Sequence, residues 1–175
     1  MATINRIGFG QVEPNHLSAQ RTAQIYAQLP ADAAIEVLEN GQFVKYDYAN
    51  GVVHASGEGE WMMVYNEVKL YDGWRETYKD FAMRKVNYTE GVMTPRVFKT
   101  NVGDIYTTNT LEKGNTAGTV KVEGTEELSV GDTLGINEAG FLAKAAADAS
   151  DMKFQVVKIY TLADGQDAVK VMRIA

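Results

Sequence analysis

Two aspartates in a repeated sequence context are the residues whose types could do chemistry. Asp104 lies in "VGDIYTTN" and Asp132 in "VGDTLGIN", 28 residues further along the chain. A glycosidase needs only two carboxyl groups, one as the acid and the other as base or nucleophile. The same context is also favourable turn chemistry, because glycine adopts positive φ freely and an aspartate side chain accepts a bond from a nearby backbone N–H.

We favour the turn interpretation and keep the carboxylate pair, as part of a small glycan-active enzyme, as an alternative. On the turn interpretation each Gly-Asp unit leads the chain into a strand. The residues expected to form turns here are Gly103, Asp104, Gly131 and Asp132.

The two histidines, His16 and His54, leave few other possibilities for catalysis. His54 is followed by Glu58 and Glu60, and a histidine with two carboxylates can bind a metal ion. Both glutamates lie beside glycines, where acidic residues are ordinary solvated turn residues, so we predict no metal site. The four serines lack a Gly-x-Ser-x-Gly context, and no phosphate-binding glycine loop is present. We therefore expect no cofactor and predict that the protein is not an enzyme.

The composition of the chain excludes several kinds of site and of binding partner. The chain of 175 residues has no cysteine, which excludes a disulfide scaffold, a thiolate metal site and a cysteine nucleophile. Its net charge is −6 and its lysines and arginines are scattered, so we predict no nucleic-acid partner and no anionic membrane surface. The N-terminal residues lack an apolar core of signal-peptide length, so we expect a soluble protein made in the cytoplasm.

The elements that would position these residues are mainly short strands. Asn40 and Gly41 lie between two strand-like runs and are the strongest short signal for a hairpin. A second Asn-Gly follows at Asn50 and Gly51, which makes a meander the expected arrangement. After Pro95 the turns recur about every 8–12 residues, the spacing of an all-β barrel or sandwich.

Two segments depart from this pattern. Residues 1–34 carry few charges and two prolines, and we predict an N-terminal arm whose apolar residues need another surface, either its own body or a partner. In residues 72–83, aromatic residues recur at spacings of three and four, which predicts a short amphipathic helix. We therefore predict an antiparallel β-barrel or sandwich with one short helix and an extended N-terminal arm. Residues 35–98 would form a meander with the helix, and 99–175 a barrel-like part of the same compact unit.

Three stretches together resemble one family. They are the arm "INRIGFGQVEPNHLSAQRTAQIYAQLP", the block "ENGQFVKYDYANG", and the tail from "TNVGDIYTTNTLEKG" through "VGDTLGINEAGFLAK" to "VKVMRIA". In these features the chain resembles the head decoration, or cement, proteins of tailed bacteriophages. The resemblance implies a structural virion protein, often a trimer, that binds the capsid exterior and staples neighbouring major capsid protein subunits. It implies no catalytic residues.

An arm that orders on binding can wrap area that a rigid body cannot reach. We therefore expect contacts to the capsid or to a sister subunit to come from the arm, through Arg6, Phe9, Asn15, Arg21 and Tyr26. The alternative function is a carbohydrate-binding β-domain of a phage fibre or cell-surface protein. That function would require exposed aromatic faces, with Trp61 and Trp74 as the sequence candidates, although such residues more often belong to a core.

Overall fold

The coarse prediction of a mainly β, antiparallel protein is confirmed by a computed structural model of the chain. The structure describes residues 10, 12–16, 29–56, 59–66, 69–70, 79–80, 82–85, 92–112, 115–116, 126–162 and 167–175. Among these residues no helix is long and apolar enough to cross a membrane.

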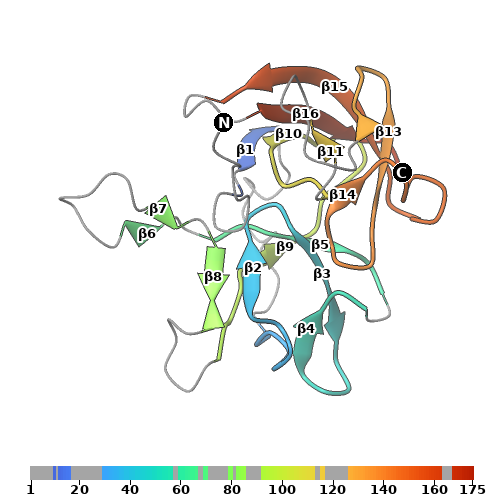
Figure 1. Ribbon diagram of the computed structural model, residues 1–175. Helices are drawn as coiled ribbons and strands as arrows, with labels where there is room; N and C mark the ends of the chain where they lie inside the picture. Colours follow the sequence, from blue (N-terminus) through green and yellow to red (C-terminus); the bar gives the residue numbers. More distant parts are fainter. Residues whose placement is uncertain are drawn as a thin grey trace.

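The largest unit is a six-stranded antiparallel sheet in the order β1-β10-β16-β15-β13-β14, which curls into a half-barrel (Figure 1). An isolated parallel bridge between Leu111 and Leu142 brings the chain after β10 to the edge strand β14. The strands of the six-stranded sheet are β1 (Val12–His16), β10 (Ile105–Thr108), β13 (Thr133–Ile136), β14 (Leu142–Ala143), β15 (Phe154–Thr161) and β16 (Asp167–Arg173). The long β15–β16 pair occupies the middle of this sheet.

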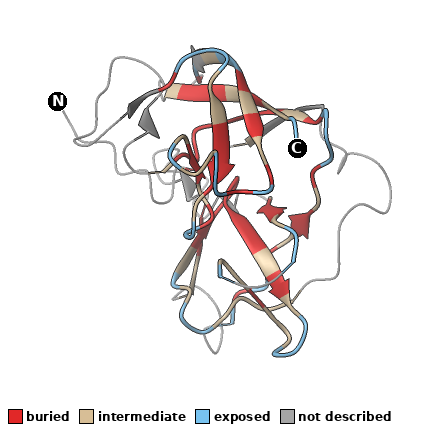
Figure 2. Ribbon diagram, turned by 90° about the vertical axis from the view of Figure 1, so that its right-hand side faces the viewer, coloured by how far each residue is buried: buried red, intermediate tan, exposed pale blue. Residues whose placement is uncertain are grey.

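A four-stranded sheet in the order β4-β3-β5-β9 lies beside the half-barrel and has both faces covered. Its strands are β3 (Phe43–Asp47), β4 (Val52–His54), β5 (Met62–Val64) and β9 (Val97–Phe98). On one face Phe43, Met63 and Phe98 join the core of the half-barrel. On the other face Val44, Val64 and Val97 join a second core. Burial on both sides explains why β5 is a continuous apolar run rather than an alternating one. Figure 2 shows buried residues along the strands in the interior of the molecule.

Three smaller pairings complete the described structure. β2 (Val37–Glu39) pairs with β8 (Ala82–Arg84) and closes the second core through Leu38 and Met83. The other pairs are antiparallel β6 (Lys69–Leu70) with β7 (Lys79–Asp80), and parallel β11 (Asn115–Thr116) with β12 (Glu126–Glu127).

The predicted helix over 72–83 is wrong at its C-terminal end. Lys79–Asp80 and Ala82–Arg84 are strands β7 and β8, and residues 72–78 lie outside the described residues. The helical spacing of aromatic residues is a local signal, whereas β8 gains a full ladder to β2 and buries Ala82 and Met83. Tertiary pairing therefore outweighs the local periodicity.

The Asn40-Gly41 turn is present, but the hairpin predicted across it is wrong. Gly41 has a φ of 86°, and the N–H of Gln42 donates to the carbonyl of Glu39 at 3.2 Å. The two flanking strands do not pair with each other: β2 pairs with β8, and β3 pairs with β4 and β5. The turn instead carries the chain from one sheet to another. The β3–β4 hairpin forms across the second Asn-Gly, where Gly51 has a φ of 68°.

Part of the predicted N-terminal arm belongs to the half-barrel. Val12–His16 is the edge strand β1 and pairs with β10 in the register Val12 to Thr108. Further along, Ala31 bridges to Val53 and packs against the second core. Residues 1–9, 11 and 17–28 lie outside the described residues. The described parts of this segment therefore pack on the protein's own body.

Candidate functional site

The two Val-Gly-Asp sequences form turns with the same set of hydrogen bonds. In the first turn, the N–H of Asp104 donates to the carbonyl of Asn101 (3.0 Å), and Asp104 Oδ2 accepts the N–H of Asn101 (2.8 Å). In the second turn the same two bonds join Asp132 and Ser129, at 3.1 and 2.8 Å. In both places the aspartate side chain closes the turn by accepting the N–H of the residue three positions earlier.

The glycines of these turns also have equivalent partners. Gly103 and Gly131 have φ values of 93° and 96° at the third position, as a type II turn requires. The N–H of Gly103 donates to the carbonyl of Arg173 (2.9 Å), and the N–H of Arg173 donates to the carbonyl of Asp104 (3.0 Å). The second turn makes the same two bonds with Val156, at 2.8 and 2.9 Å. In each case the glycine and the aspartate lie opposite one residue of the paired strand, which is a G1 bulge. Each Val-Gly-Asp sequence therefore forms a turn followed by a bulge, and strand β10 or β13 begins after it.

The structure does not bring the two carboxylates together. β10 and β13 are separated in the sheet by β16 and β15, and three strand spacings amount to about 14 Å along the sheet. The paired carboxyl groups of glycosidases are about 5–9.5 Å apart. Each carboxylate is also occupied by its own turn. The geometry therefore gives no support to a shared catalytic role for Asp104 and Asp132.

Each turn carries an exposed valine at its second position. Val102 is 66% exposed and Val130 is 64% exposed. On the paired strand, the residue that bonds to each turn glycine is followed by another exposed apolar residue, Ile174 at the first turn and Val157 at the second. These four residues, which we call the apolar corners, are most of the large exposed hydrophobic residues in the described part of the chain.

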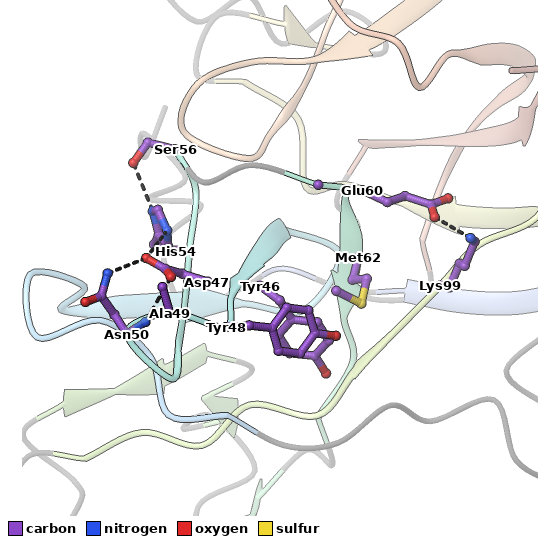
Figure 3. Close-up of a pocket in the computed structure, with 11 residues that line it drawn as sticks. Tyr46, Asp47, Tyr48, Ala49, Asn50, His54, Ser56, Glu60, Met62 and Lys99 are labelled. Atoms are coloured by element: carbon purple, nitrogen blue, oxygen red, sulfur yellow. Dashed lines mark hydrogen bonds and ion pairs between the residues drawn. The ribbon is translucent and has the colours of Figure 1, made fainter.

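A hollow of about 800 Å³ lies beside the β3–β4 hairpin (Figure 3). We call it the hairpin hollow. Figure 3 shows the rings of Tyr46 and Tyr48 between a polar group on one side and an ion pair on the other. The polar group is Asp47, Asn50, His54 and Ser56, and the ion pair is Glu60 with Lys99.

The polar group of the hairpin hollow resembles a serine-hydrolase triad in composition only. His54 Nδ1 is 3.0 Å from Ser56 Oγ, and His54 Nε2 is 3.5 Å from Asp47 Oδ2. In the serine-hydrolase template the nucleophile bonds to Nε2 and the carboxylate to Nδ1, so the two nitrogens are reversed here. His54 Nε2 is buried and makes no hydrogen bond to any described residue. We interpret these contacts as ones that hold the end of the hairpin.

Asp47 closes the turn of the same hairpin. Its carboxylate accepts the side-chain amide of Asn50 at 2.7 Å and the backbone N–H of Asn50 at 3.0 Å. These two bonds, the side-chain one first, hold the pKa of Asp47 below its usual value, with a smaller contribution from the nearby His54. Asp47 is therefore an ionised acceptor at neutral pH, fixed at the rim of the hollow.

Glu60, one of the two glutamates near His54 in the sequence, is engaged in ion pairs. Its carboxylate forms an ion pair with Lys99 and lies 3.3 Å from Arg173 Nη1, so two cations already occupy it. No group of three or more potential metal ligands occurs in the part of the chain that the structure describes. Glu58 lies outside the described residues.

Of the two tryptophans expected to form a sugar platform, Trp61 lies in the described part of the chain. Trp61 packs partly against the first core, and Lys45 Nζ lies over its ring at 4.5 Å from the centroid. Trp74 lies outside the described residues. Tyr48, which sequence reasoning missed, is 77% exposed. Its signal was the alternation Tyr46-Asp47-Tyr48 just before the Asn50-Gly51 turn, which puts both tyrosines on one face of the hairpin.

One of the five predicted contact residues lies in the described part of the chain. Asn15 lies in the edge strand β1. The other four, Arg6, Phe9, Arg21 and Tyr26, lie outside the described residues. Comparisons of the chain with protein-family models, with curated proteins and with solved structures find no match.

Proposed function

We propose that this protein is a structural protein that binds the outer surface of a bacteriophage capsid and joins neighbouring major capsid protein subunits. The proposal continues the resemblance of the arm, the Asn-Gly block and the tail to phage head decoration proteins. On this proposal it is located on the capsid exterior and acts as an oligomer, with a trimer favoured. A protein that engages several capsid subunits at once gains avidity without any single strong contact.

The observation that carries the proposal is the pair of apolar corners. Val102 and Val130 project from turns that are each fixed by four backbone or side-chain hydrogen bonds. Exposed apolar groups held on rigid backbone suit a protein-binding role, because little conformational freedom is lost when they are buried. Two such corners on one sheet offer two separate attachment points.

The N-terminal residues remain proposed contacts together with the corners. Arg6 and Phe9 precede the edge strand β1, and that strand belongs to the body of the protein. Deleting the whole segment would also remove β1 and expose the edge of β10. Substituting Arg6 and Phe9 by alanine, with β1 left in place, therefore tests the arm without damaging the sheet.

Binding to capsids assembled from the major capsid protein of the same virus tests the proposal. We expect the double variant Val102→Lys/Val130→Lys to bind about 30-fold more weakly, because about 2 kcal/mol of apolar burial is lost. Val92→Lys is the control, since Val92 is an exposed valine that belongs to neither turn. Co-sedimentation with purified capsids measures the change. Wild-type protein that fails to co-sediment would refute the capsid proposal itself. If the double variant binds as tightly as the wild type, the apolar corners are not capsid contacts.

A further inference from the structure

The hairpin hollow has an exposed aromatic ring, Tyr48, that packs against a buried one, Tyr46. Tyr46 is buried in the second core, and its ring centroid is 5.3 Å from that of Tyr48, with the planes tilted by 45°. Tyr48 is held by this contact yet leaves most of its ring exposed. An exposed tyrosine ring on a rigid support can bury the apolar face of a ligand at low entropic cost.

The groups around this platform can both donate and accept hydrogen bonds. Asp47 and Glu60 supply carboxylate oxygens, Lys99 supplies ammonium donors, and Ser56 supplies a hydroxyl. Figure 3 shows these groups on both sides of the two rings. Hydroxyl groups of a ligand, which donate and accept at once, match such a mixed lining better than a ligand with only donors or only acceptors does.

Both carboxylates of the hollow already have partners, which favours a neutral ligand. Glu60 is paired with Lys99 and Arg173, and Asp47 accepts two hydrogen bonds from Asn50. A cation would find the carboxylate of Glu60 already occupied, and an anion would meet two carboxylates. The volume of about 800 Å³ lies within the range of about 300–1,000 Å³ that ligand sites occupy.

We propose that the hairpin hollow binds a neutral oligosaccharide, with the apolar face of one sugar ring stacked on Tyr48. The hydroxyl groups of that sugar and its neighbour bond to Asp47 on one side and to Lys99 on the other. Val102 and Val130, the corner valines proposed to contact the capsid, are not among the residues that line the hollow, so separate variants can test the two functions. A protein with both would attach a glycan-binding site to the particle.

Ligand-observed saturation-transfer NMR on the full chain tests this site. The probes are trisaccharides of glucose, galactose, mannose and N-acetylglucosamine, titrated into the millimolar range. We expect saturable binding of at least one of them. We expect Tyr48→Ala to weaken that binding about tenfold, because the stacking surface is removed from an exposed position that the fold does not need.

Tyr48→Phe and Val92→Ala are the matched controls, and both should bind as the wild type does. Tyr48→Phe keeps the ring, while Val92 is exposed and outside the lining of the hollow. Failure of all four trisaccharides to bind would overturn the proposal, as would unchanged binding by Tyr48→Ala. Binding of tetramethylammonium without any trisaccharide would overturn it in favour of a cation site.

The capsid proposal can fail independently of this one. Tyr48→Ala should co-sediment with capsids as the wild type does, and Val102→Lys/Val130→Lys should keep its affinity for the trisaccharide. Loss of both activities in either variant would instead show that the variant is misfolded, which the near-ultraviolet circular dichroism of the same samples detects directly.

Discussion

The turn at Asn101–Asp104 and the turn at Ser129–Asp132 have the same backbone and different surroundings. Their glycine φ values differ by only a few degrees, and their four hydrogen bonds match one for one. Asp104, however, is only 8% exposed, whereas the carboxylate of Asp132 is near the surface, 3.1 Å from Lys144 Nζ. A short sequence can therefore determine a local conformation while its neighbours determine how much each side chain contributes to stability.

The largest expected difference between the turns is in their aspartates. We expect Asp104→Ala to lower the free energy of unfolding by about 2 kcal/mol and Asp132→Ala by about 1 kcal/mol. Both variants leave a backbone N–H without its acceptor, but water replaces the carboxylate more easily at the exposed turn. Urea denaturation of the two variants measures the difference, with the exposed Asp148→Ala as the control. Equal losses would show that burial does not separate the two turns.

A smaller difference between the turns is expected at the two glycines, where the loss of stability should be equal. An alanine at position 103 or 131 would have to adopt φ above 90°, but its Cβ would meet no heavy atom within 4 Å in either turn. The cost is therefore backbone strain alone, about 1–2 kcal/mol in each case.

Thermal or urea unfolding of Gly103→Ala and Gly131→Ala checks this equality. A third variant, Gly140→Ala, gives the contrast, because its Cβ would clash with the backbone carbonyl of Phe43 in addition to the strain. Gly140→Ala should lose clearly more stability than the other two. A large difference between Gly103→Ala and Gly131→Ala would mean that the turns are not equivalent.

The smallest expected effect is a pH dependence of the free energy of unfolding that comes from Asp132 in the second turn. The N–H of Ser129 lowers the pKa of Asp132, and Lys144 lowers it further. A carboxyl group whose folded-state pKa is lowered contributes stability that is fully present above its unfolded pKa of about 3.9, and that is lost as pH falls through the folded-state value. The stability gap between wild type and Asp132→Asn should therefore shrink on acidification below about pH 4.

Urea titrations at a series of pH values measure that gap. Lys144→Met serves as the companion variant, since it removes the ion pair and leaves the Ser129 bond in place. In this background the acid-dependent part of the gap should be smaller but still present. A gap that stays constant from neutral to acidic pH would contradict the assignment of the low pKa to Asp132.

Local turn chemistry was the most predictable part of the molecule. The strands that begin after Asp104 and Asp132 follow from glycine and aspartate at fixed positions. The C-terminal end of the helix predicted over 72–83 and the hairpin predicted across Asn40-Gly41 were wrong for one reason. Each rested on a local pattern, while β2 and β8 find each other across more than forty residues.

The candidate site was only partly predictable. The residues of the hairpin hollow come from the β3–β4 hairpin, from Glu60 and from Lys99, which is beyond β9 in the chain. Tyr46 and Tyr48 could be placed on one face from their spacing, but the spacing does not say that Tyr46 is buried and Tyr48 exposed. The apolar corners likewise required the register between each turn and its paired strand.

The sequence by itself determined the strand-rich character and the positions of the Asn-Gly and Gly-Asp turns, because glycine, asparagine and aspartate act on their own backbone within a few residues. Only the tertiary structure decided which strands pair, which face of β3 and β5 belongs to which core, and how far apart Asp104 and Asp132 lie. Those properties depend on contacts between residues distant in the chain, and such contacts are determined by the burial of both faces of a sheet at once.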